Sequence, residues 1–99
     1  MRLSPYQRDV IRRATAEVAG PAARVFLFGS RTRAQARGGD IDLLIELDQA
    51  RSDHLALACR IGARIEQQLG EQKIDILVAD SATPRSPVLD AARREGVAL

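Results

Sequence analysis

The sequence predicts an α+β domain in which helices and strands alternate in the order αβαβαβα around a small mixed β-sheet. Three short apolar runs rich in Val, Ile, Leu and Phe have the length of buried strands. Stretches that begin with a helix-capping residue and end at a glycine separate these runs. The 99 residues suffice for one domain, 1–99, but not for two. The expected strands cover 24–28, 40–47 and 73–79, and the expected helices start at Ser4, Ser30, Ser52 or Asp53, and Ser86.

Capping residues define the expected helices. Ser4, Pro5 and Gln7 form a capping box with proline at the first helical position, and Ser86-Pro87 repeats the start of this pattern. Glycines close each helix. The apolar positions expected to face the core are Tyr6, Val10, Ile11, Ala14 and Val18 in the first helix, Leu55, Ala58, Gly62, Ile65 and Leu69 in the long helix, and Val88, Leu89 and Ala92 in the last.

Two carboxylates occur at the start of the second expected strand, in Asp40-Ile41-Asp42. Because residues i and i+2 of a strand point to the same side, Asp40 and Asp42 share one face, and the apolar side chains from Ile41 onward line the other. Two carboxylates about 5 Å apart repel each other by roughly 3 kcal/mol at an effective dielectric constant of about 20. The pair therefore needs protons, an Arg or Lys, or a hard cation beside it.

Gly29-Ser30 follows the first expected strand, where the chain must turn sharply. Gly allows the backbone to pass close to a ligand, and Ser30 can cap the next helix, whose first N–H groups can hold an anion. Arg31 and Arg33 fall in the first turn of that helix, where a cation opposes the helix dipole unless an anion binds. A phosphate cradle beside two carboxylates suits a nucleoside triphosphate bound with magnesium.

The third expected strand carries Asp75 near its beginning, on the face opposite its apolar residues. One long helix joins the second and third strands, which suits a right-handed crossover between parallel strands. Parallel strands begin at the same edge of a sheet, so Asp75 is expected beside Asp40 and Asp42. For the turn at Gly29 to reach that edge, the first strand must run opposite to the other two, and the sheet must be mixed.

The composition excludes several other classes of site. The formal charge of +2 is small and only three residues are aromatic, so no strong nucleic-acid binding is expected. A single cysteine, Cys59, excludes an internal disulfide, and with one histidine it excludes an ordinary structural zinc site. We expect Cys59 to be an inert core thiol and His54 to be a surface residue without a partner rather than a base. With no apolar run of membrane-spanning length and no signal-peptide core, a cytoplasmic location is expected.

At these residues the sequence resembles a known family. Gly29-Ser30, nine intervening residues and Asp40-Ile41-Asp42 are similar to the signature of nucleotidyltransferases related to DNA polymerase beta. The small size suggests their minimal branch, the MNT-domain proteins often encoded beside HEPN-domain toxins as antitoxins. The resemblance extends over nearly the whole chain and includes 73–78 and 94–97. The minimal branch usually has one residue more between Gly-Ser and the first Asp, and often a Ser where Gly39 stands.

The resemblance implies a polymerase beta-like nucleotidyltransferase fold and a phosphoryl-transfer site with two magnesium ions. Asp40 and Asp42 would hold both ions, and Asp75 would complete the catalytic ion and orient or deprotonate the attacking hydroxyl. ATP would be the nucleotide substrate, and pyrophosphate would be released. The residues implied in binding the nucleotide are Gly29, Ser30, Arg31 and Arg33.

The acceptor is expected to come from a partner protein, because little sequence follows the last expected helix. The resemblance implies a HEPN toxin, an all-helical ribonuclease that is silenced when one of its tyrosines receives AMP. Two alternatives stay open. The chain could be a binding module that neutralises the toxin by contact with a vestigial metal site, an alternative that the nine-residue spacing and Gly39 keep open. It could also be a subunit of a small-molecule nucleotidyltransferase whose acceptor pocket forms in a homo- or hetero-oligomer.

Overall fold

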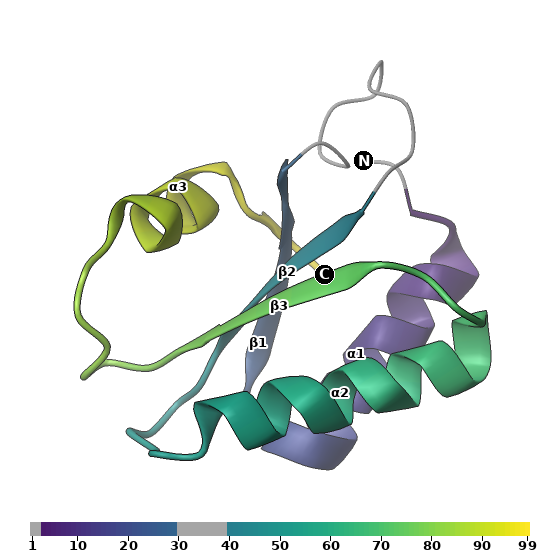
Figure 1. Ribbon diagram of the computed structural model, residues 1–99, viewed down its shortest axis with the longest axis horizontal. Helices are drawn as coiled ribbons and strands as arrows, with labels where there is room; N and C mark the ends of the chain where they lie inside the picture. Colours follow the sequence, from purple (N-terminus) through teal and green to yellow (C-terminus); the bar gives the residue numbers. More distant parts are fainter. Residues whose placement is uncertain (1–2, 30–39) are drawn as a thin grey trace.

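The computed structural model describes residues 3–29 and 40–99. The helix expected to start at Ser30 lies outside these residues. The described helices and strands follow the predicted order, except that the helix between the first two strands is not among them and one short strand is added at the end (Figure 1). In chain order the elements are α1 (Pro5–Ala19), β1 (Arg24–Phe28), β2 (Ile41–Glu46), α2 (His54–Leu69), β3 (Ile74–Ala79), α3 (Pro87–Glu95) and β4 (Val97–Ala98).

The sheet is mixed, as predicted. Its strand order is β3-β2-β1-β4. β1 runs antiparallel to β2, whereas β2 and β3 are parallel and are joined by the α2 crossover. β4, which the sequence did not predict, pairs antiparallel with Phe26 and Leu27 of β1. It was missed because two residues are too few to show a strand periodicity.

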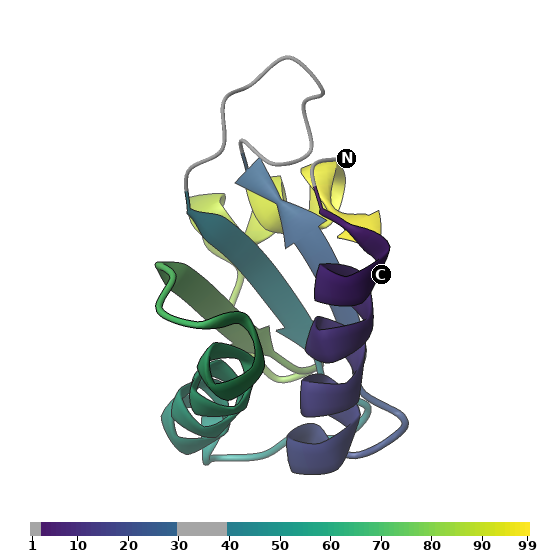
Figure 2. The same cartoon turned by 90° about the vertical axis from the view of Figure 1, so that its right-hand side faces the viewer.

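The helices cover both faces of the sheet. Figure 2 shows α1 and α2 on one side and α3 on the other. The larger core cluster lies between the sheet and α1 and α2, while Leu89 and Ala92 of α3 pack with Leu44 and Ala79 on the opposite face. β2 is therefore buried on both faces beyond its first residues, which explains its continuous apolar run.

The predicted side-chain caps of α1 and α3 are present, but that of α2 is not, because Asp53 occupies its N-cap position with its carboxylate bonded to Arg51 instead. Ser4 and Gln7 form the capping box of α1, and the Ser86 hydroxyl accepts a hydrogen bond from the N–H of Leu89. Of the apolar residues predicted to face the core from α1 and α3, Tyr6 and Val88 are instead exposed. Both lie in the first turn of their helix, where an exposed side chain costs little. Within the described ranges, no helix combines the length and apolarity needed to cross a membrane.

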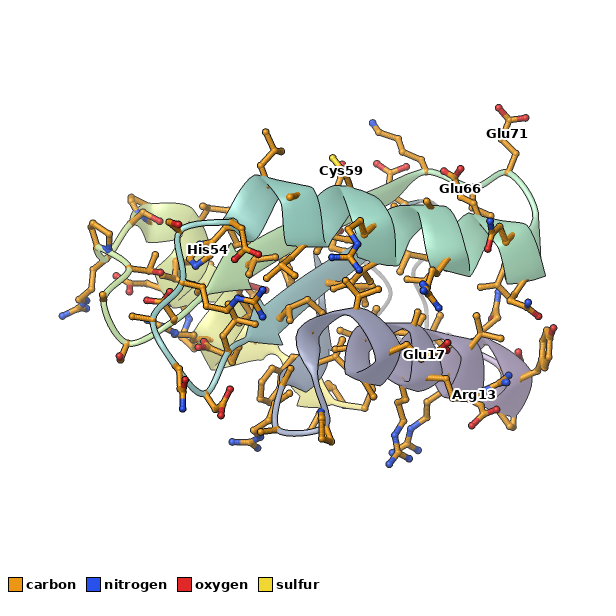
Figure 3. All side chains as sticks on the ribbon, turned by 90° about the horizontal axis from the view of Figure 1, so that it is seen from below. Arg13, Glu17, His54, Cys59, Glu66 and Glu71 are labelled. Atoms are coloured by element: carbon orange, nitrogen blue, oxygen red, sulfur yellow. The ribbon has the colours of Figure 1, made fainter. Side chains whose placement is uncertain are left out.

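The buried face of α2 differs from the prediction. Leu57, Ile61 and Ile65 are fully buried, whereas Leu55 is 79% exposed. Three large apolar residues at i, i+4 and i+8 bury more area than a stripe that includes Ala58 and Gly62, so the helix is rotated toward them. Cys59 lies between Leu57 and Ile61 and thus on the opposite side, exposed rather than in the core as predicted. Figure 3 shows it on the side of α2 turned away from α1.

We expect Ile61→Ala to destabilise the protein by roughly 2–5 kcal/mol, because it leaves a cavity between α2 and the sheet. Leu55→Ala removes a similar number of carbons from an exposed position of the same helix and should change the free energy of unfolding by no more than about 0.5 kcal/mol. Urea denaturation of the two variants measures both values. Equal losses would contradict the observed rotation of α2.

Candidate active site

Asp42 and Asp75 are direct partners in the parallel register of β2 and β3. Their side chains are within hydrogen-bonding reach of each other. Asp40 immediately precedes β2, and its charge also acts on Asp42. The structure thus places the three predicted carboxylates at one edge of the sheet, called here the acid edge, where β2 and β3 both begin.

Gly29 follows β1 at the same edge. Because β1 is antiparallel to β2, its last residue, Phe28, pairs with Asp42. Gly29 has a φ of +76°, which favours glycine, and a Cβ atom at this position would overlap the Asp42 carboxylate. A side chain here would displace that carboxylate, so glycine permits both the turn and the position of Asp42.

The acid edge is electrostatically crowded. Partial burial is the largest cause that raises the pKa of Asp42. The negative charges of Asp75 and Asp40 and a hydrogen bond with Asp75 raise this pKa further. Only Lys73, among the causes of this shift, lowers the pKa. A carboxylate in this position is stabilised by a proton or by a cation that binds beside it.

Asp40 forms an ion pair with Lys73, with 3.4 Å between the Asp40 Oδ2 and the Lys73 Nζ. Among residues 3–29 and 40–99, no three His, Cys, Asp or Glu side chains are grouped as a metal site. The carboxylate oxygens of the acid edge are nonetheless the donors that magnesium prefers, and the crowding of Asp42 is what a bound cation would relieve. The donor set therefore fits magnesium in its chemistry.

The predicted nucleotide-binding residues are only partly described. Gly29 lies beside Asp42 at the acid edge. Ser30, Arg31 and Arg33 lie outside the described residues, and their contacts with nucleotide stay a prediction.

Asp80 directly follows β3, at the end of the strand away from Asp75. The sequence predicts no site there, because this stretch is rich in turn residues. In the structure the Asp80 carboxylate is buried, with 3% of the residue exposed. It accepts hydrogen bonds from the N–H groups of Arg51 (2.9 Å) and Ala82 (2.8 Å) and lies 2.7 Å from His54 Nε2. These bonds, the one from Arg51 foremost, lower its pKa to about 2. Its own N–H donates to Thr83 Oγ1 (2.9 Å), and the Asp-x-x-Thr spacing is the signal that could have indicated this local structure.

His54 therefore has a partner, contrary to the prediction. Its side chain is 29% exposed and contacts Asp80, which is distant in sequence and is brought to the first turn of α2 by the end of β3. Asp80 lies five residues beyond Asp75, roughly 16 Å along the strand. The pair thus joins the start of α2 to the end of β3 and does not reach the acid edge.

A cavity of about 370 Å³ opens on the α3 side of the sheet, at the opposite end of β2 from Asp42. Phe26, Leu44, Glu46 and Arg93 are among its lining residues. Glu46 and Arg93 pair at 2.6 Å across it. The cavity is separate from the acid edge.

Carboxylates at the edge of a mixed sheet, with a glycine turn beside them, are the kind of oxygen donors that a metal-dependent phosphoryl-transfer domain uses. A family model described as "Nucleotidyltransferase domain" matches residues 9–94, and the chain belongs to this family. Three helices and a four-stranded mixed sheet in the described residues agree with the polymerase beta-like fold. Comparison with curated proteins found no match.

Gly29→Ala tests the contact between the turn and Asp42. The positive φ should cost the variant roughly 1–2 kcal/mol of stability, and the new methyl group should also move the Asp42 carboxylate and weaken divalent-cation binding. Gly70→Ala is a matched control, because Gly70 has a similar φ of +81° and no atom lies within 4 Å of the position that its Cβ would take. Urea denaturation and Mn²⁺ titration measure both effects. Equal cation binding by the two variants would show that the contact has no role.

Low pH should lower the free energy of unfolding, because it protonates Asp80. Its folded pKa of about 2 is below the ordinary 3.8, so its ionised form stabilises the protein above about pH 4, and this contribution is lost as the pH falls toward 2. We expect Asp80→Asn to lower Tm at pH 7 by roughly 4–8 °C and to reduce the acid dependence between pH 4 and 2. Thermal unfolding from pH 2 to 7 checks this. Asp48→Asn, at an exposed position, should change neither the Tm at pH 7 nor its dependence on pH. Curves of Tm against pH that run parallel for wild type and Asp80→Asn would contradict the role assigned to Asp80.

Proposed function

We propose that this domain transfers AMP from ATP to a tyrosine of a HEPN-domain toxin and thereby neutralises the toxin. One observation carries the proposal, the register that pairs Asp42 with Asp75 beside the Gly29 turn. Membership of the family supports nucleotidyl transfer in general. The choice of ATP, tyrosine and toxin rests on the resemblance to MNT-domain antitoxins.

In the proposed reaction the tyrosine oxygen attacks the α-phosphorus of ATP. The bond between that phosphorus and the bridging oxygen of the β-phosphate breaks, and pyrophosphate leaves. Asp75, which is exposed at the start of β3, would orient the hydroxyl and accept its proton. Gly29 and Ser30 would hold the triphosphate, with Arg31 and Arg33 nearby in sequence.

Asp40, Asp42 and Asp75 would hold the magnesium ions. When bound, these ions supply charge neutralisation to the triphosphate and to the departing pyrophosphate. The raised pKa of Asp42 supports this assignment, because a carboxylate crowded by like charges gains more from a cation than an isolated one does.

The second candidate is a binding module that neutralises the toxin by contact alone. The specific observation in its favour is that, in the described ranges, the carboxylates are not already grouped around a cation position, since Asp40 pairs with Lys73. The two candidates differ in whether Asp42 is needed for neutralisation.

The test incubates the protein with α-labelled ATP, magnesium and the protein encoded by the neighbouring reading frame. We expect label on that protein and release of pyrophosphate. Asp42→Asn should lower the rate at least roughly a hundredfold, because it removes a charge from the position that the cation needs. Asp48→Asn, at the exposed position just past the other end of β2, is the matched control and should retain full activity.

Absence of label with the wild-type protein, or equal labelling by Asp42→Asn, would contradict the proposed transfer. Cells that express the toxin distinguish the second candidate. Protection by Asp42→Asn as complete as that by wild type would identify the binding module, whereas loss of protection would support the enzyme.

A further inference from the structure

Lys73 is the only lysine in a chain with 15 basic residues. It directly precedes β3, and its carbonyl oxygen accepts a hydrogen bond of 3.0 Å from the N–H of Ile41. This backbone bond fixes Lys73 beside the start of β2. Its ammonium group then lies 3.4 Å from the Asp40 carboxylate, with 72% of the lysine and 43% of the aspartate side chain exposed.

Lys73 is the basic residue that forms an ion pair at the acid edge in the part of the chain that the structure describes. Within the described residues, no other Lys or Arg forms an ion pair with Asp40, Asp42 or Asp75. In these ranges, the ion pairs of the acid edge thus supply one positive charge beside three carboxylates.

The position of Asp40 has a consequence for cation binding. Its carboxylate is paired to Lys73, and within the described residues the three acids are not grouped as a metal site. A divalent cation that uses the Oδ2 atom of Asp40 competes with Lys73 for that oxygen. A lysine charge that stays nearby also repels the incoming cation.

We propose that Lys73 is a positioning residue that competes with the divalent cation for Asp40: it holds this carboxylate in the cation-free protein and lowers the affinity of the acid edge for the metal. The inference rests on the proposed function, because it takes the acid edge as the metal site. Lysine suits this role. Its single, flexible point charge can withdraw, whereas the planar fork of arginine would hold a carboxylate with two bonds.

The experiment titrates the protein with Mn²⁺, with free Mn²⁺ followed by electron paramagnetic resonance, and measures the rise in Tm caused by Mg²⁺. Lys73→Gln should bind Mn²⁺ roughly two- to fivefold more tightly than wild type, the range that corresponds to an exposed ion pair. Lys73→Arg should bind it more weakly than wild type. The rise in Tm should follow the same order.

Arg85→Gln is the matched control. Arg85 forms an exposed ion pair of similar length, 3.3 Å, with Asp90 of α3, so this variant loses the same charge away from the acid edge. Its affinity for Mn²⁺ should equal that of wild type. An equal gain in Arg85→Gln and Lys73→Gln would show an effect of net charge alone and would overturn the role of Lys73.

Asp42→Asn separates failure of this inference from failure of the proposed function. If wild type binds Mn²⁺ and Asp42→Asn does not, the acid edge is the metal site. In that case, unchanged or weaker binding by Lys73→Gln overturns only the role of Lys73. If wild type does not bind Mn²⁺, or Asp42→Asn binds it equally well, both the metal site and the competition are wrong.

Discussion

The parallel register of β2 and β3 is the constraint on which the acid edge depends. Backbone hydrogen bonds from Ile41 to Lys73 and from Leu47 to Ala79 fix the two strands at both ends of their pairing. A shift of one residue would turn Asp75 toward the apolar core under α2, because side chains alternate between the faces of a strand. In the described sheet β3 is a border strand, and Asp75 is exposed.

Two aspartates of this strand pair show how surroundings decide the behaviour of one residue type. Asp42 lies among like charges and is partly buried, and its pKa is raised. Asp80 is more deeply buried, but backbone N–H groups and His54 satisfy its oxygens, and its pKa is lowered to about 2. The first carboxylate destabilises the cation-free fold at neutral pH, whereas the second stabilises it. The apolar layers on both sides of the sheet maintain the strand register despite this local cost.

Short-range patterns in the sequence were sufficient to predict the main elements and the candidate acids. Apolar runs identified the three longer strands, and the cap at Ser4 identified a helix start to the residue. The crossover rule placed Asp75 beside Asp42. These predictions succeeded because each depends on residues close in sequence or on a general rule of chain connection.

The sequence by itself thus determined the α+β order and the edge of the sheet at which the three acids lie. Only the tertiary structure decided the rotation of α2, the exposure of Cys59, the contact of His54 with Asp80, and the pairing of Asp40 with Lys73. Each of these depends on which distant segment packs against a residue. Helical spacing alone is compatible with more than one buried stripe, and a lone polar residue carries no signal of a partner that lies elsewhere in the chain.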